Sequence, residues 1–138
     1  MVTIDNVEYP YRRLYKLKQM AELLIHKPNS YFKHFSFIGK GNRIHSVGWN
    51  RNGCPGSVIE GRRFEYPLGG VHSESDAIAE LTDLNICRKA CLVNIRLNNQ
   101  MELRNSKPCP ICYNLIKTVG IKRVFYTTDI GFSYMEIR

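Results

Sequence analysis

The chain has 138 residues, a formal net charge of +8 at pH 7 and 43% hydrophobic residues. These values are typical of one soluble globular domain that is long enough to bury a core. No run approaches the ~18 apolar residues of a membrane span, and residues 1–5 lack the basic and apolar regions of a signal peptide. We therefore expect one cytoplasmic domain over residues 1–138, with no membrane partner.

Hydrophobic patterning predicts a mixture of helices and strands. Apolar residues recur at helical spacing in three segments, and β-prone runs fill five others. The expected helices run from about Tyr11 to His26, from about Ser73 to Leu84 and from near Pro110 to a C-cap at Gly120. The expected strands are Phe32–Gly39, Arg43–Trp49, Ala90–Leu97, Arg123–Thr128 and Tyr134–Ile137. This order predicts a three-layer α/β/α fold around a mixed five-stranded sheet, with residues 50–70 as a long loop.

Two short motifs, about 35 residues apart, carry the chemical information. The segments His72-Ser73-Glu74 and Pro108-Cys109-Pro110-Ile111-Cys112 read H-x-E and P-C-x-x-C. One imidazole and two thiolates can hold a zinc ion and leave a fourth position open for water, which is the arrangement of catalytic zinc. A carboxylate beside them can carry protons. The joint pattern predicts hydrolytic removal of an exocyclic amine from a nucleobase.

The two motifs place different demands on the fold. Cys109 and Cys112 meet on one side of a helix start, where the helix N-terminus favours the thiolate. On a helix, His72 and Glu74 would point roughly 200° apart. They converge only if the metal lies over the end of the helix. We therefore expect two helix N-termini that face each other across a zinc ion.

Each motif has another explanation when it is taken alone. The C-P-I-C pair also suits a redox pair or half of a structural zinc site. A structural site would need a fourth ligand, for which His26, His34 and His45 are candidates. That alternative gives Glu74 no role, so the catalytic interpretation is favoured. A non-enzymatic zinc-binding module of the same fold is kept as an alternative function.

At these residues the chain resembles the cytidine/deoxycytidylate deaminase superfamily. Its His72–Ile78 segment is similar to the family block H-[ACV]-E-x-x-A-[IL], and Lys107–Cys112 is similar to the P-C-x-x-C block. The resemblance implies one catalytic proton carrier, Glu74, and three zinc ligands. These ligands are His72, Cys109 and Cys112.

The resemblance also bears on the substrate. Val47-Gly48-Trp49-Asn50 is similar to the family's G-x-N, which implies that Asn50 contacts the substrate. The tight turn after Thr128 implies antiparallel last strands, as in free-nucleoside deaminases. The Asn50–Gly56 segment is instead similar to a loop of deoxycytidylate deaminases. The two features conflict about the branch of the family, and hydrolysis of cytosine in a free nucleoside or nucleotide is the function that we expect.

Two substrate classes stay open. For a free nucleotide, Arg51, Arg62 and Arg63 of the long loop would bind the 5′-phosphate. For single-stranded DNA or RNA, the positive charge would attract the backbone, and residues 1–50 carry 8 basic against 3 acidic groups. Bases would then stack on aromatic residues. The candidates are Trp49, Phe64, Tyr66 and Tyr126. A homo-oligomer is compatible with either class.

Overall fold

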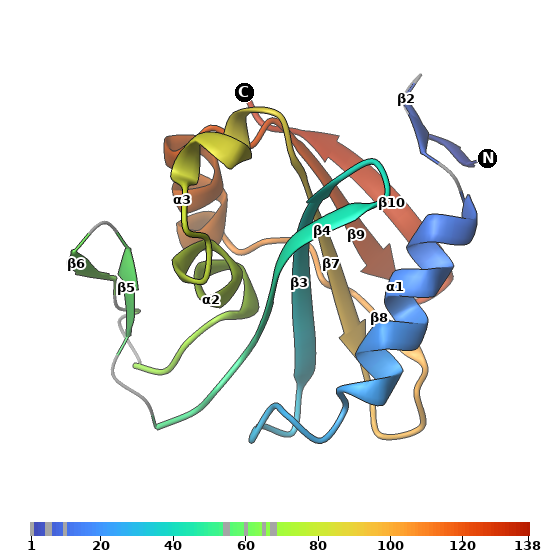
Figure 1. Cartoon of the computed structure of the whole chain (residues 1–138). Coiled ribbons are helices and arrows are strands. Elements are labelled where there is room, and N and C mark those ends of the chain that lie inside the picture. Colours follow the sequence, from blue (N-terminus) through green and yellow to red (C-terminus); the bar gives the residue numbers. More distant parts are fainter. Residues whose placement is uncertain are drawn as a thin grey trace.

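A mixed β-sheet forms the centre of the molecule, with the strand order β10-β9-β7-β3-β4 (Figure 1). These strands are β3 (Lys33–Lys40), β4 (Arg43–Trp49), β7 (Cys91–Leu97), β9 (Arg123–Thr128) and β10 (Gly131–Glu136). Neighbouring strands are antiparallel, except that β7 and β9 run parallel. The computed structural model describes residues 2–4, 7–9, 11–53, 56–59, 61–64, 66 and 69–138.

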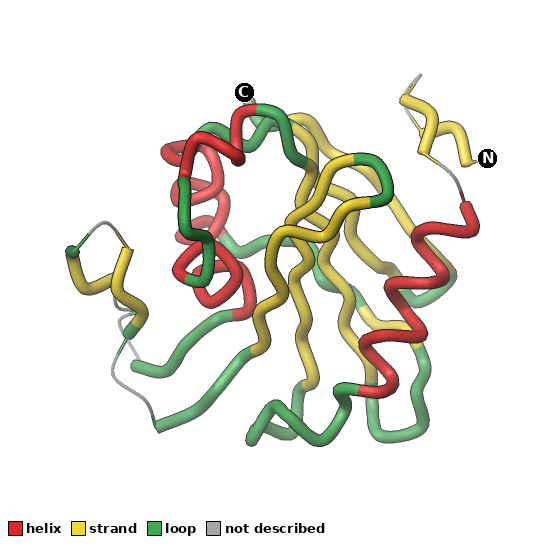
Figure 2. The backbone as a smooth tube through the Cα atoms, in the orientation of Figure 1, coloured by secondary structure: helices red, strands yellow, loops and turns green. Residues whose placement is uncertain are grey.

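Helices cover both faces of the sheet (Figure 2). Helix α1 (Tyr11–Leu23) packs on one face, and α2 (Ser73–Ala79) and α3 (Pro110–Val119) pack on the other. Side chains of β3 alternate between the two faces of the sheet and pack in both hydrophobic cores. Phe35 and Phe37 face α1, whereas Ile38 faces α2 and α3. None of the described helices is long and apolar enough to cross a membrane. The three-layer α/β/α architecture is confirmed.

Most of the expected elements are present, and β9 and β10 are antiparallel as expected. The sheet has a sixth strand, β8 (Leu103–Arg104), which pairs with β7. The expectation of five strands was therefore wrong, because the sheet has six. The sixth strand was missed since two residues are too few to show a periodicity. The last strand also starts earlier, at Gly131 instead of Tyr134.

Short hairpins interrupt two segments that the periodicity left unassigned. The expected long loop contains the pair β5 (Ser57–Ile59) and β6 (Arg62–Phe64). A second hairpin, β1 (Val2–Ile4) and β2 (Val7–Tyr9), precedes α1. Each strand has only three residues, which is below the length at which alternation can be recognised.

The second helix is shorter than expected. It ends at Ala79 and is followed by a 3₁₀ helix, η1 (Leu84–Arg88). The Asp83 side chain accepts a hydrogen bond from the Asn85 N–H at 2.9 Å and caps η1. Local side-chain bonding of this kind competes with continuation of an α-helix.

A glycine in β4 lies where α2 crosses the sheet. A Cβ atom at Gly48 would lie 2.3 Å from Ala77 N and 2.4 Å from Ser73 O. Two residues earlier on the same strand, the Ser46 hydroxyl donates to Ala77 O at 2.8 Å. The backbone of α2 therefore rests directly on β4. This contact sets the depth of the helix start that follows His72.

Gly48→Ala should lower the free energy of unfolding by about 3 kcal/mol or more, because the methyl group overlaps backbone atoms that cannot rotate away. Gly61→Ala is the control. Nothing lies within 4 Å of that site, but its φ of +75° should cost about 1–2 kcal/mol. Urea unfolding measures the loss of unfolding free energy in both variants. A loss at Gly48 no larger than the loss at Gly61 would contradict the direct packing of α2 on β4.

Candidate metal centre and active site

Two helix N-termini meet on the α2/α3 face of the sheet. His72 is the N-cap of α2 and Cys109 is the N-cap of α3, and both have extended backbone angles. Pro110 occupies the first turn of α3, where no N–H is required, and Gly120 closes that helix with a φ of +98°. The expectation that His72 projects from a helix end is confirmed.

The three expected ligand side chains lie together. Their donor atoms all fall within 4.8 Å of one another. His72 Nδ1 lies 3.8 Å from Cys109 Sγ and 3.5 Å from Cys112 Sγ. Zinc bond lengths place tetrahedral nitrogen and sulfur ligands about 3.6 Å apart, so the spacing fits a zinc ion. The three residues can hold a metal ion.

The two thiols have opposite environments. The pKa of Cys109 is lowered to about 5, chiefly by its hydrogen bond with the Cys112 thiol and also by the Cys112 backbone N–H and His72. The pKa of Cys112 is raised, because its proton is shared with Cys109 and because it is buried. Cys109 is thus ready to bind a cation as the thiolate, and binding at Cys112 releases a proton.

Glu74 is buried beside the cluster. Its side chain accepts hydrogen bonds from Asn94 Nδ2 at 3.0 Å and from the Ser73 hydroxyl at 3.1 Å. Asn94 is itself fixed, because Nδ2 also donates to Ser106 O and Oδ1 accepts from the Ser36 hydroxyl at 2.6 Å. Burial raises the pKa of Glu74 despite these bonds. A buried carboxyl group whose pKa is raised holds a proton more readily than a free one and can both accept and return it.

Tyr66 covers the imidazole of His72. The two rings stack at 3.5 Å between centroids with an angle of 11°. The tyrosine hydroxyl lies 2.6 Å from Cys112 Sγ, and burial raises its pKa. Base stacking was one expectation for this residue. In the structure its ring packs on His72, so it forms a wall of the cluster.

Two other residues expected at the substrate are bonded to the protein itself. Asn50 accepts the His34 N–H at 3.0 Å and donates to Phe32 O at 2.8 Å, which ties the end of β4 to the start of β3. Arg51 forms an ion pair with Asp76 at 2.6 Å. These contacts favour structural roles for both side chains, although the buried Arg51 Nε has no hydrogen-bond partner among the described residues.

The aromatic candidates lie on different faces of the sheet. Trp49 packs with the α1 core, opposite the cluster, whereas Tyr126 packs with the α2/α3 core on the cluster side. The structure therefore does not bring Trp49 to the site. The side chains of Arg62 and Arg63 lie outside the described residues, so their role stays a prediction.

Comparison of the sequence with protein-family models and with curated proteins gives no match. Solved structures do match. The dCMP deaminase of cyanophage S-TIM5 in its apo form is 22% identical with a TM-score of 0.57, and the match covers 86% of this chain and 84% of that chain. Its complex with dCMP and dUMP gives the same identity and TM-score, with coverages of 87% and 83%.

A cytidine deaminase from Burkholderia pseudomallei is 13% identical with a TM-score of 0.54, and the match covers 89% of this chain and 91% of that chain. The chain has the fold of the cytidine and deoxycytidylate deaminases. The resemblance at the two motifs is therefore confirmed at the level of the fold. The deaminase fold explains why two helix N-termini, far apart in sequence, meet at one place.

The structure reveals a row of basic residues that the motifs did not indicate. His34 on β3, Arg96 on β7 and Arg104 on β8 are direct cross-strand partners. Arg96 lies two residues from Asn94 and therefore on the same face of the sheet, the face that carries the cluster. Its guanidinium packs over Phe32 at 4.3 Å from the ring centroid.

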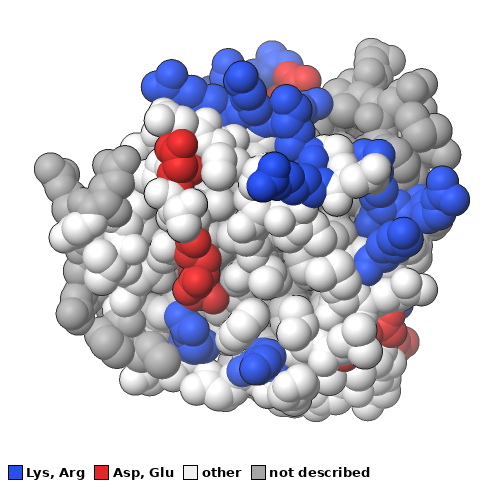
Figure 3. All heavy atoms as spheres, in the orientation of Figure 1, with Lys and Arg blue, Asp and Glu red and all other residues white. Residues whose placement is uncertain are grey.

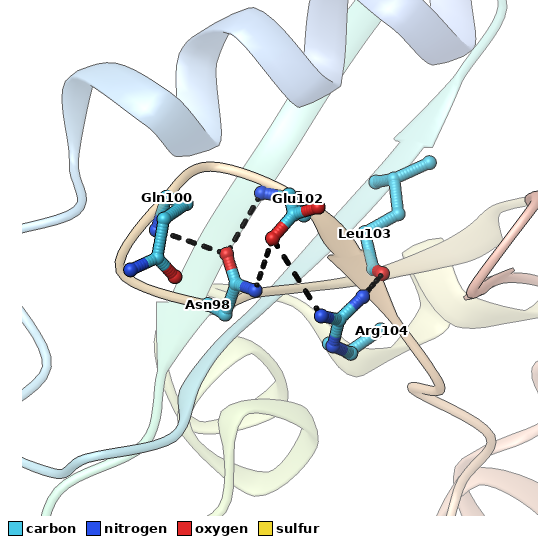
Figure 4. Close-up of polar contacts among 5 residues, drawn as sticks. All are labelled: Asn98, Gln100, Glu102, Leu103 and Arg104. Atoms are coloured by element: carbon cyan, nitrogen blue, oxygen red, sulfur yellow. Dashed lines mark hydrogen bonds and ion pairs between the residues drawn. The ribbon is translucent and has the colours of Figure 1, made fainter.

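The members of this row differ in charge and in partners. The pKa of His34 is lowered to about 4, first by burial and then by the positive charges of Arg96 and His72, so its ring is neutral at pH 7. Arg104 lies 3.6 Å from Glu102, whose carboxylate also accepts from Asn98 (Figure 4). None of the ion pairs found among the described residues involves Arg96.

The purified protein should contain about one equivalent of zinc per chain. Cys112→Ala should lose most of it, because the remaining Cys109 and His72 give only two protein ligands. Cys91→Ala is the matched control, since Cys91 is a buried thiol in the α1 core. Metal analysis by atomic emission provides the measurement. Retention of zinc by Cys112→Ala, or equal loss in both variants, would contradict the assignment.

Proposed function

We propose that the protein is a zinc-dependent hydrolytic deaminase that converts cytosine in a free nucleotide or nucleoside to uracil and ammonia. One observation carries the proposal. A buried carboxyl group with a raised pKa, Glu74, lies beside a His/Cys/Cys cluster at two helix N-termini. The deaminase fold supports the reaction class. The S-TIM5 enzyme in complex with dCMP and dUMP supports a pyrimidine nucleotide as substrate.

Each side chain has one task in this proposal. His72, Cys109 and Cys112 would hold the zinc ion, which, when bound, lowers the pKa of a water molecule to ~7. Glu74 accepts a proton from the attacking water and delivers it to the ring nitrogen. It then moves the proton of the added hydroxyl group to the amine, so that C4 becomes a carbonyl and the amine leaves as ammonia. Asn94 and Ser73 hold the carboxylate in place during both transfers.

A purely structural zinc site is less well supported. Such a site is normally closed by four protein ligands. Among the described residues, the metal-binding cluster contains three, and neither His26, His34 nor His45 belongs to it. A cluster of three protein ligands leaves a position for water, as hydrolysis requires.

Arg96 is the best-supported anchor for a 5′-phosphate. It lies about 7 Å along β7 from Asn94, the residue that holds Glu74. Arg51 is engaged with Asp76, whereas Arg96 forms no ion pair among the described residues. A guanidinium can bind a phosphate through two parallel hydrogen bonds. The substrate class that fits this arrangement is a cytosine mononucleotide.

Wild-type protein should release ammonia from dCMP or a related cytosine monomer, and Glu74→Gln should lower kcat by about 10²–10⁴-fold, because no group then moves the proton. A panel of cytidine, deoxycytidine, CMP, dCMP, adenosine and a cytosine-containing oligonucleotide identifies the substrate. Glu80→Gln, at the C-cap of α2, is the control and should keep near-normal activity.

Zinc content must be equal in the three proteins, so that the loss reports proton transfer and not metal loss. Full activity in Glu74→Gln would contradict the proposed mechanism. Absence of ammonia release from every compound, with zinc bound, would favour the non-enzymatic module. Activity confined to the oligonucleotide would favour the polynucleotide class.

Arg96→Gln should raise KM for dCMP by about 10-fold or more and change KM for deoxycytidine by less than threefold, because a hydrogen-bonded charge pair contributes about 1.5–3 kcal/mol. Steady-state kinetics on the two substrates measures the difference. Arg88→Gln, an exposed arginine of η1 beside the C-cap of α3, is the control. Equal effects of Arg96→Gln on KM for both substrates would rule out phosphate binding by Arg96. If instead Arg62→Gln combined with Arg63→Gln raises KM for dCMP alone, phosphate binding belongs to the loop of residues 50–70.

A further inference from the structure

A groove of about 560 Å³ lies between α1 and the β3–β4 hairpin. Its floor includes Phe37, Cys91 and Val93, which belong to the α1 core. The groove is therefore on the face of the sheet opposite the candidate metal centre. Its volume lies in the range of small-molecule sites, about 300–1,000 Å³, and is large enough for one nucleobase and its sugar.

The walls of the groove are strongly basic. Arg12, Arg13 and Lys16 come from α1, and Arg43 comes from the start of β4. No Asp or Glu is found among the described residues that line it. None of the four cations takes part in an ion pair within the described part of the chain. Four positive charges with no acidic partner among the described residues form a site for an anion.

The β3–β4 turn brings the two walls together. Gly41 has a φ of +58°, a conformation that L side chains rarely adopt. The Arg13 guanidinium reaches this turn, since its Nη1 lies 4.0 Å from the position that a Cβ of Gly41 would occupy. Cations from α1 and from the hairpin therefore line the same groove.

The positive charge continues beyond the groove, across the end of the sheet. The register of Gly39 with Cys91 and of Cys91 with Arg123 aligns the ends of β3, β7 and β9. Strands are spaced about 4.8 Å apart, so the row from β4 to β9 is about 14 Å long. Exposed basic residues occur at each of these strand ends: Lys40, Arg43, Lys89, Lys122 and Arg123. Figure 3 shows Lys and Arg gathered along this edge and over α1.

We propose that the groove and the adjoining row bind single-stranded nucleic acid, separately from the candidate metal centre. Three of the four cations in the groove are arginines, which bind phosphate bidentately. A row of about 14 Å is longer than one nucleotide, because a DNA strand rises about 3.4 Å per nucleotide. The concave, partly apolar groove accepts an unpaired base, whereas a flat membrane surface cannot enter it.

Fluorescence anisotropy with a labelled 20-mer of deoxythymidine, at 50 and 200 mM NaCl, tests the proposal on the full chain. Wild type should bind, and Arg13→Gln combined with Arg43→Gln should weaken binding at 50 mM by about 5- to 20-fold. The double variant should also reduce the slope of log K against log salt by about 1.4, for two lost contacts. Lys27→Gln combined with Lys117→Gln removes the same charge elsewhere and should change binding by less than twofold.

Thermal midpoints and zinc contents within error of the wild-type values show that the variants are folded. Three outcomes would overturn the proposal: no binding of the 20-mer at 50 mM NaCl, equal weakening in the two double variants, or dTMP that competes as tightly as an unlabelled 20-mer. The last result would assign the groove to a short anion. Tighter binding of a duplex of equal length would overturn the single-strand assignment.

Discussion

The candidate site depends on how closely α2 approaches the sheet. Helix backbone meets strand backbone at Gly48, with no side chain between them. That contact, together with the bond from Ser46 to Ala77 O, fixes the start of α2 relative to β4 and β3. From there Glu74 meets Asn94 on β7. A larger residue at Gly48 would lift the helix and separate the carboxylate from the sheet that holds it.

Burial of Glu74 suits its proposed role in proton transfer but lowers the stability of the fold when the carboxyl group is ionised. Its pKa is raised in the fold, so the protonated form is favoured there. The raised pKa of Glu74 therefore stabilises the fold at a pH below the pKa of this residue in the unfolded chain. This stabilisation is lost as the pH rises through the raised pKa of the folded state. Hydrogen bonds from Asn94 and Ser73 offset part of this loss. A cation bound at the neighbouring cluster would offset more, because opposite charge favours the carboxylate.

Sequence patterns predicted the residues that carry the chemistry better than they predicted the residues around them. The joint H-x-E and P-C-x-x-C pattern, with the family resemblance, predicted two helix starts at which His72 meets Cys109 and Cys112. The ion pair of Arg51 could not be predicted from the sequence, because its partner Asp76 is 25 residues away and lies beside it only in the folded chain. Arg96 was missed for a similar reason, since its strand is tied to the site by the contact of Asn94 with Glu74, which is 20 residues away. Short elements such as β8 were missed because two residues contain no periodicity.

The central claim is that the cluster and Glu74 together add water to a cytosine ring. The most direct measurement is mass spectrometry of the product formed from dCMP in ¹⁸O-labelled water by zinc-loaded protein. The account predicts dUMP that carries one ¹⁸O atom at C4, formed with one equivalent of ammonia. Unchanged dCMP and deoxycytidine, recovered from protein that holds one zinc per chain, would contradict it.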